Sequence, residues 1–301
     1  MKVLVKNTFN QMFKLIPMII TSIIALLLGI LMAYGYTKLV NQNLTYEKMV
    51  SNIEIIFIII NFVFLTGMIL WIIVASSATS LFASEIHEGT MRLLLAKQIS
   101  RLELVAGKIV GMLLGSMAYL GLIYLIFILS FVVISGVEKD ILILVLKYTG
   151  SFIIFGLLMI FIVGGIGSFL SSCFKRKVPA IIILIILMML IFFIIPIARI
   201  LIGDIYQNYH LYYLDINYHL ASIYSQFIDL LGGINASLDE LSSLNLFTNL
   251  FPYVTPDYDL TASVVDCMNK TINGTIIMAI YLSLAVILYY FSYRRILKMD
   301  I

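Results

Sequence analysis

Charged side chains that could contact another molecule are concentrated in one short segment. Ser84–Lys108 carries seven charged residues and lies between two of the most hydrophobic stretches of the chain. Such side chains are costly inside a bilayer and favour water or an opposite charge on a partner. The segment is therefore the first candidate for a contact outside the hydrophobic stretches.

Motifs for catalysis, metal binding and ATP hydrolysis are missing from the sequence. It contains no G-x-x-x-x-G-K-[ST] loop, which would hold the phosphates of ATP, and no H-E-x-x-H zinc motif. The three histidines, His87, His210 and His219, are too scattered to form a metal-ligand cluster with the two cysteines. We therefore expect no catalytic residue, no metal and no cofactor in this chain. Its net charge of +3 gives no reason to expect a nucleic-acid partner.

Long hydrophobic stretches dominate the chain. Hydrophobic residues make up 62% of it, whereas a soluble domain has about 45–50%. A helix needs about 20 mostly apolar residues to cross the bilayer, and lipid offers no partner to backbone groups left unpaired outside a helix. The sequence thus predicts an all-α membrane protein in which residues 1–301 form a single transmembrane domain. Six stretches meet the length requirement: 15–37, 55–83, 106–134, 146–172, 178–202 and 274–293.

The distribution of Lys and Arg predicts the orientation of the six spans. An even number of spans places both termini on one side, and that side holds 13 of the 19 basic residues. Because basic residues accumulate in cytoplasmic loops, we expect a multi-pass protein of the plasma membrane with both termini in the cytoplasm.

Ionisable residues are missing from the central parts of the predicted spans. Glu54, Lys147 and Arg199 fall at span ends, from which their side chains can reach water. Ion-coupled carriers usually keep ionisable residues inside the bilayer, so the sequence argues against that class of transporter.

Residues before the first span mix apolar and polar side chains. Val3, Phe9, Met12 and Phe13 stand among lysines and asparagines. This pattern predicts a short amphipathic helix on the inner membrane surface. The alternative is an irregular N-terminus that leads directly into the first span.

A long extracytoplasmic loop, 203–273, separates the last two predicted spans. A loop of this length without structure is uncommon, so we expect it to be structured. Its acidic residues, among them Asp257, Asp259 and Asp266, allow two interpretations. They belong either to a lid of interfacial helices or to a surface that attracts a cationic amphipathic substrate.

Small residues recur at every fourth position in two spans. Such ladders let helix backbones approach closely, either within one subunit or at a seam between two copies. The ladders are Gly107, Gly111 and Gly115 in the third span and Gly164, Ser168 and Ser172 in the fourth.

The connection between the second and third spans contains a helical pattern. Gly89 and Thr90 can begin a short helix, in which Met91, Leu94 and Leu95 form one apolar stripe. A helix of about two turns is not stable alone. It therefore needs a surface to rest on, either the membrane or a partner protein.

A capping signal follows this short helix. Ser100 and Glu103 form the S-x-x-E pattern of a capping box, which predicts that the third span restarts there. The predicted cytoplasmic connection therefore covers residues 84–105.

The same connection resembles the E-G-T…L-L-L…P-x-S-R…G-K signature of ABC-2 type exporter permeases, where it also lies between spans two and three. One position departs from the signature, because Gln98 stands where the family usually has Pro. The matching residues are Glu88, Gly89, Thr90, Leu93, Leu94, Leu95, Ser100, Arg101, Gly107 and Lys108.

The resemblance implies a mechanism and partners. The connection would be a coupling helix that docks into a cytoplasmic ABC ATPase subunit, and two permease copies, identical or different, would assemble with two ATPases. ATP and Mg would bind to the partner ATPase. The candidate coupling residues are Glu85, Glu88, Gly89, Thr90, Met91, Arg92, Leu94, Leu95, Ser100 and Arg101.

The function that follows is the membrane-spanning permease subunit of an ATP-driven exporter. Its substrate would be hydrophobic or amphipathic, such as a peptide, an antimicrobial drug or a lipid-like molecule. The alternative is a non-transporting immunity, sensor or scaffold protein that binds a peptide through its outer loop. A P-loop ATPase gene beside the gene for this chain would distinguish the exporter from the alternative.

Overall fold

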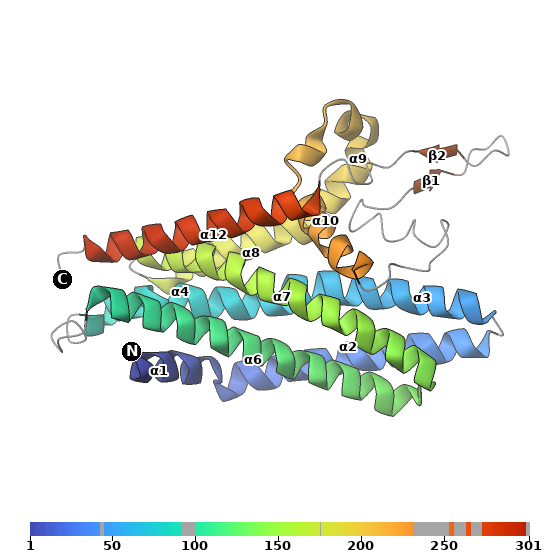
Figure 1. Cartoon of the computed structure of the whole chain (residues 1–301), viewed down its shortest axis with the longest axis horizontal. Helices are drawn as coiled ribbons and strands as arrows, with labels where there is room; N and C mark the ends of the chain where they lie inside the picture. Colours follow the sequence, from blue (N-terminus) through green and yellow to red (C-terminus); the bar gives the residue numbers. More distant parts are fainter. Residues whose placement is uncertain are drawn as a thin grey trace.

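Long helices run side by side and form one elongated bundle (Figure 1). The computed structural model describes residues 1–42, 45–91, 100–174, 176–230, 253–255, 263–265 and 273–298. The N-terminus and the last turn of α12 (Gly274–Leu297) lie at one end of the bundle, here called the terminal end (Figure 1). The turn between α6 (Arg101–Ser135) and α7 (Lys139–Cys173) lies at the opposite, distal end.

The helical elements are nearly continuous within each span. The second span combines α3, a π-helix and α4, and the fifth combines α8, a shorter π-helix and α9. The bounds are α1 Lys2–Met12, α2 Leu15–Asn41, α3 Tyr46–Ile59, η1 Ile60–Leu70, α4 Trp71–Glu88, α6 Arg101–Ser135, α7 Lys139–Cys173, α8 Lys177–Met189, η2 Leu190–Ile194, α9 Ile195–Asn208, η3 Leu211–Tyr213, α10 Ile216–Asp229 and α12 Gly274–Leu297.

Six helical stretches are long and apolar enough to cross a membrane. Each contains most of one predicted span, so the six-helix class predicted from the sequence is confirmed. The stretches are Leu15–Asn41, Tyr46–Glu88, Arg101–Ser135, Lys139–Cys173, Lys177–Arg199 and Gly274–Leu297.

The loop between the last two spans adds α10 and a small sheet to the bundle. Strands β1 (Tyr253–Thr255) and β2 (Ser263–Val265) pair antiparallel, with Tyr253 opposite Val265. The all-α class therefore holds for the bundle, while the outer loop contributes a short hairpin. The predicted substrate residues Asp257, Asp259 and Asp266 lie outside the described residues.

Helix α7 is the centre of the bundle. It packs against α4, α6, α10 and α12. Of the residues in its most apolar stretch, 61% are buried. In contrast, only 17% of the residues in the most apolar stretch of α2, and the same share in α12, are buried. Both helices expose rows of Ile and Leu. A large exposed apolar surface of this kind suits lipid rather than water.

An aromatic cluster closes the distal half of the core. Tyr224 of α10 inserts among Phe62, Phe152 and Phe155, at ring-centroid distances of 5.1, 4.8 and 5.2 Å. Such offset and edge contacts add to the burial of the rings. They attach α10, which is too short to span a membrane, to the second and fourth spans.

The second span carries a buried carboxylate, Glu54, which the sequence analysis placed at the end of the span. Glu54 is 1% exposed and accepts a hydrogen bond from the Tyr148 hydroxyl at 3.0 Å. The expectation that Glu54 reaches water is therefore wrong, because α3 begins at Tyr46 and α7 supplies the partner. Lys147, by contrast, is exposed.

The N-terminal helix α1 packs along the first turns of α6. A Cβ placed on Gly111 would lie 2.7 Å from the Val5 carbonyl oxygen, and one on Gly115 would lie 2.5 Å from Met12 Sδ. A Cβ placed on Gly107 would lie 3.1 Å from Leu4 Cβ. The predicted amphipathic helix thus forms, and the first small-residue ladder is its packing surface within this subunit.

The second ladder packs against α12. A Cβ on Gly164 would lie 2.6 Å from the Tyr289 hydroxyl. The Ser292 hydroxyl donates to the Ser168 carbonyl and Arg295 Nε to the Ser172 carbonyl, both at 3.1 Å. Both ladders are therefore covered by helices of the same chain.

Substituting a ladder glycine should separate α1 from α6. Gly111→Ala places a methyl group against the Val5 backbone, which cannot rotate away, so the free energy of unfolding should fall by about 1–3 kcal/mol. Gly121→Ala in the same helix is the matched control, since nothing lies within 4 Å of its new Cβ. Thermal unfolding of both purified variants measures the difference. Equal midpoints would contradict this packing.

Candidate coupling site at the terminal end of the bundle

Gly89 separates α4 from the connection that follows. Its φ of 72° lies in the left-handed region, which glycine adopts readily and which commonly ends a helix. A new helical turn begins directly afterwards, at Thr90 and Met91. Residues 92–99 lie outside the described part of the chain. Three predicted coupling residues fall among them: Arg92, Leu94 and Leu95.

Met91 packs inside the subunit. Its side chain is 1% exposed and joins α4, α6 and α12 in one apolar cluster, here called the Met91 cluster. The cluster consists of Ala78, Leu81, Phe82, Met91, Leu104, Val105, Met112 and Ile296. Met91 therefore fixes the start of the connection to three spans, whereas the sequence analysis assigned its side chain to the ATPase.

The capping box predicted at the start of α6 is present. The Glu103 amide donates to the Ser100 hydroxyl at 3.2 Å, and the Ser100 amide donates to the Glu103 carboxylate at 3.4 Å. Each bond satisfies a backbone donor that the helix itself leaves unpaired. Ser100 therefore marks the end of the connection, as Gly89 marks its beginning.

Arg101 joins α6 to the last turn of α12. Its Nη1 donates to the carbonyl oxygens of Ile296 at 3.1 Å and Leu297 at 2.5 Å. A cation at a helix C-terminus pairs with unsatisfied carbonyls and with the negative end of the helix dipole. Arg101, a predicted ATPase contact, thus has a role within the subunit.

A buried ion pair connects α4 and α6 one helical turn before Gly89. The Lys108 ammonium pairs with the Glu85 carboxylate and donates to the Leu81 carbonyl oxygen at 2.6 Å. The two side chains are only 6% and 20% exposed. Glu85, another predicted ATPase contact, therefore has its partner inside the chain.

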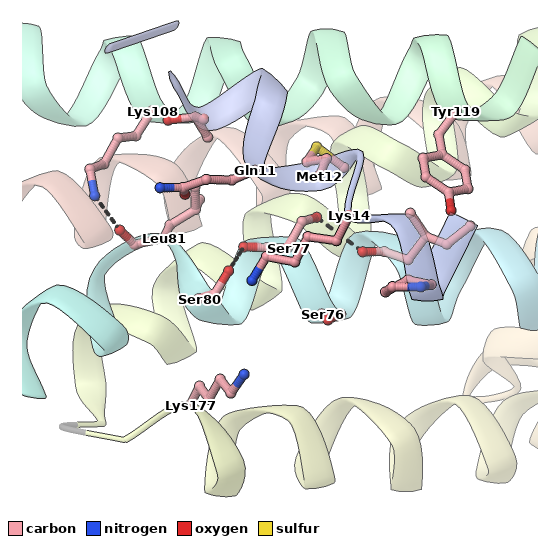
Figure 2. A pocket seen from close by; sticks show the side chains of 13 residues that line it. Gln11, Met12, Lys14, Ser76, Ser77, Ser80, Leu81, Lys108, Tyr119 and Lys177 are labelled. Atoms are coloured by element: carbon pink, nitrogen blue, oxygen red, sulfur yellow. Dashed lines mark hydrogen bonds between the residues drawn. The ribbon is translucent and has the colours of Figure 1, made fainter. Parts of the chain in front are cut away.

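Two adjacent cavities open beside this ion pair. The smaller, of about 120 Å³, lies between the α1–α2 junction, α4 and the start of α8 (Figure 2). The larger, of about 620 Å³, extends to the end of α4 and is lined by Glu85, Glu88 and Thr90. Four residues line both cavities: Gln11, Lys14, Ser80 and Lys177.

Sequence reasoning found part of this site and missed the rest. Glu85, Glu88 and Thr90 were predicted as site residues, because they lie in the charged connection. Gln11, Lys14 and Lys177 come from segments far away in the sequence, and no local pattern connects them with α4. The polar side chains around the cavities are hydroxyls, an amide, carboxylates and cations, which suit ionic and hydrogen-bonded contacts.

A second buried ion pair lies near the distal end, between α9 and α10. Arg199 Nη2 bonds to Asp215 Oδ2 at 2.6 Å and to Asn217 Oδ1 at 2.9 Å, and the Tyr206 hydroxyl donates to the same carboxylate at 2.7 Å. Arg199 was expected to reach water from a span end. That expectation is wrong, because α10 folds back and buries the guanidinium at 8% exposure.

Removing one partner of the Lys108–Glu85 pair should destabilise the terminal end. Lys108→Met or Glu85→Leu leaves a charge without its partner in a mostly buried position, at a cost of up to about 3–5 kcal/mol. The double variant removes both charges and should lose less stability than the sum of the two single variants. Thermal unfolding of the four proteins measures the coupling, and strict additivity would contradict it.

The contact of α10 with α12 should weaken at acid pH. Burial lowers the pKa of His219 below its ordinary value of 6.5, although the Asp215 charge acts in the opposite direction. The unfolded chain then binds this proton more readily than the folded chain, so stability falls as the pH drops below about 6.5. His219 also contacts the Tyr281 hydroxyl at 3.1 Å.

Thermal midpoints measured between about pH 8 and pH 5 check this effect of His219. His219→Gln should show a smaller fall in the midpoint than the natural protein. The same fall in both proteins would assign the pH dependence to other groups.

Comparison with known proteins gives one family. The family described as ABC-2 family transporter protein matches residues 12–301, which is nearly the whole chain. No curated protein matches the chain. The six apolar helices and the connection between the second and third of them agree with the resemblance found in the sequence. The chain therefore belongs to the ABC-2 family of membrane transport proteins.

Proposed function

We propose that this chain is the membrane-spanning permease subunit of an ATP-driven exporter in the plasma membrane. Separate ABC ATPase subunits bind and hydrolyse ATP with Mg, and two permease copies form the transport path. The terminal end of the bundle faces the cytoplasm, in agreement with its excess of Lys and Arg.

One observation carries this proposal: the short connection after Gly89 is attached to three spans at once. Met91 packs among α4, α6 and α12, the Lys108–Glu85 pair joins α4 to α6, and Arg101 joins α6 to α12. Packed interiors transmit displacement because they leave little free volume. A push on this connection therefore moves all three helices, as a coupling segment requires.

The exported substrate is hydrophobic or amphipathic. Apolar and aromatic side chains form most of the buried surface of the bundle, and the buried charges in the described residues are already paired or hydrogen-bonded. A strongly charged solute would need compensating charges along its path. Peptides, antimicrobial drugs and lipid-like molecules meet this requirement.

The first test of the proposal is whether an ATPase binds to the connection. Leu94→Asp should weaken co-purification of a P-loop ATPase encoded beside this chain by tenfold or more, because burying a Leu side chain contributes roughly 1.5–3 kcal/mol. Leu102→Asp is the matched control, since Leu102 begins α6 at the same end and is 57% exposed. ATPase yield and its stimulation by the permease are the measurements.

The outcomes distinguish the candidate functions. Loss of the ATPase from Leu94→Asp alone supports the coupling role of the connection. Wild-type yield and stimulation with Leu94→Asp, or no neighbouring ATPase gene at all, would favour the non-transporting alternative.

A further inference from the structure

The two cavities at the terminal end have the chemistry of an anion site. Lys14 lies at the junction of α1 and α2, and Lys177 is the first residue of α8. Lys177 extends toward α4 from one side of the space (Figure 2). Lys14 lines the same cavity together with Ser77 and Ser80 of α4. Two ammonium groups from different elements therefore border one cavity.

These cations have no counterion within the described part of the chain. The ion pairs there are Lys108–Glu85 and Arg199–Asp215, and neither includes Lys14, Arg176 or Lys177. Arg176 lines the larger cavity as well. Of the acidic residues that line that cavity, Glu85 is already neutralised by Lys108. Glu88 then offers a single negative charge against the three cations Lys14, Arg176 and Lys177. The cavity walls thus carry an excess of positive charge.

The first turn of α8 adds to this positive field. Among the residues that the structure describes, no side chain caps its N-terminus. The free backbone N–H groups of this turn, which Pro179 lacks, and the helix dipole favour an anion there. Gln11 and Ser80 contribute an amide and a hydroxyl to both cavities. The Gln11 amide can donate a hydrogen bond to a phosphate oxygen, whereas the Ser80 hydroxyl already donates to the Ser77 carbonyl oxygen at 2.8 Å.

The smaller cavity is amphipathic. Besides its polar residues it is lined by Met12, Pro17, Ile73, Leu81 and Tyr119. It lies between the first turn of α2 and the part of α4 from Ile73 to Leu81. The exposed Ile and Leu side chains of α2 begin at this turn, with Leu15 and Ile16. A ligand that fits both cavities therefore has an anionic head and an apolar chain.

We propose that these cavities bind an anionic phospholipid, with its phosphate between Lys14 and Lys177 and an acyl chain along α2 and α4. Basic pockets between helices at the cytoplasmic side are suited to anionic head groups. The site goes beyond the proposed export function, because it concerns a resident lipid and not the transported substrate. The proposed orientation decides only which leaflet supplies the lipid.

Native mass spectrometry of the full-length protein in detergent micelles tests the proposal. The probes are dioleoyl phosphatidylglycerol, dioleoyl phosphatidylcholine and glycerol phosphate, the last being a soluble head group without chains. We expect phosphatidylglycerol to bind in preference to the other two, and to raise the thermal midpoint of unfolding. Equal binding of phosphatidylcholine would overturn the anion site, and equal binding of glycerol phosphate would overturn its assignment to a lipid.

Charge variants localise the binding. Lys14→Gln with Lys177→Gln should weaken phosphatidylglycerol binding roughly 10- to 30-fold, because each lysine near a phosphate contributes about a fivefold factor. Lys14→Arg with Lys177→Arg should retain it. The matched control is Lys2→Gln with Lys6→Gln, which removes the same charge from exposed positions on α1 that do not line these cavities.

The comparison of variants decides the proposal. All four lysines are exposed, so these substitutions should leave the fold intact, and circular dichroism checks this. A selective loss in the Lys14 and Lys177 double variant supports the site. Equal binding by the two Gln double variants, whether both strong or both weak, would overturn it.

Discussion

The Lys108–Glu85 ion pair sets the geometry of the terminal end of the bundle. An ammonium group among apolar helices is tolerated only with an opposite charge and a hydrogen-bond acceptor, and α4 supplies both, through Glu85 and the Leu81 carbonyl. The pair fixes α4 against α6 one turn before Gly89. The connection that leaves Gly89 therefore starts from a defined position, and Met91 and Arg101 extend this attachment to α12.

Buried charged side chains need polar partners in the distal half of the bundle as well. Arg199 and Glu54 are buried because α10 and α7 bring Asp215, Asn217 and Tyr148 to them. Helix α10 is held by polar contacts at its first turn and by the aromatic rings around Tyr224 two turns later. Polar partners at both ends and apolar packing between them make the bundle one closely packed body.

Some of the site could be predicted from the sequence because its signals are local. The capping box at Ser100 and the start of a new helical turn after Gly89 depend on neighbours within a few residues, and both are present. Other assignments needed contacts across the chain. Glu85, Met91 and Arg101 look like surface residues of a charged connection, yet each has its partner in another helix. The lysines of the proposed lipid site come from junctions that no sequence pattern connects.

The sequence by itself determined the class of this protein. Runs of about 20 apolar residues are typical of membrane helices, and their number, their order and the charged connection between them can be read from the sequence alone. Only the tertiary structure decided which faces of those helices meet. An apolar helix buried in lipid and one buried in protein have nearly the same composition, so hydrophobicity does not distinguish packing from exposure. The glycine ladder of α6 therefore had no assigned partner until the fold placed α1 on it.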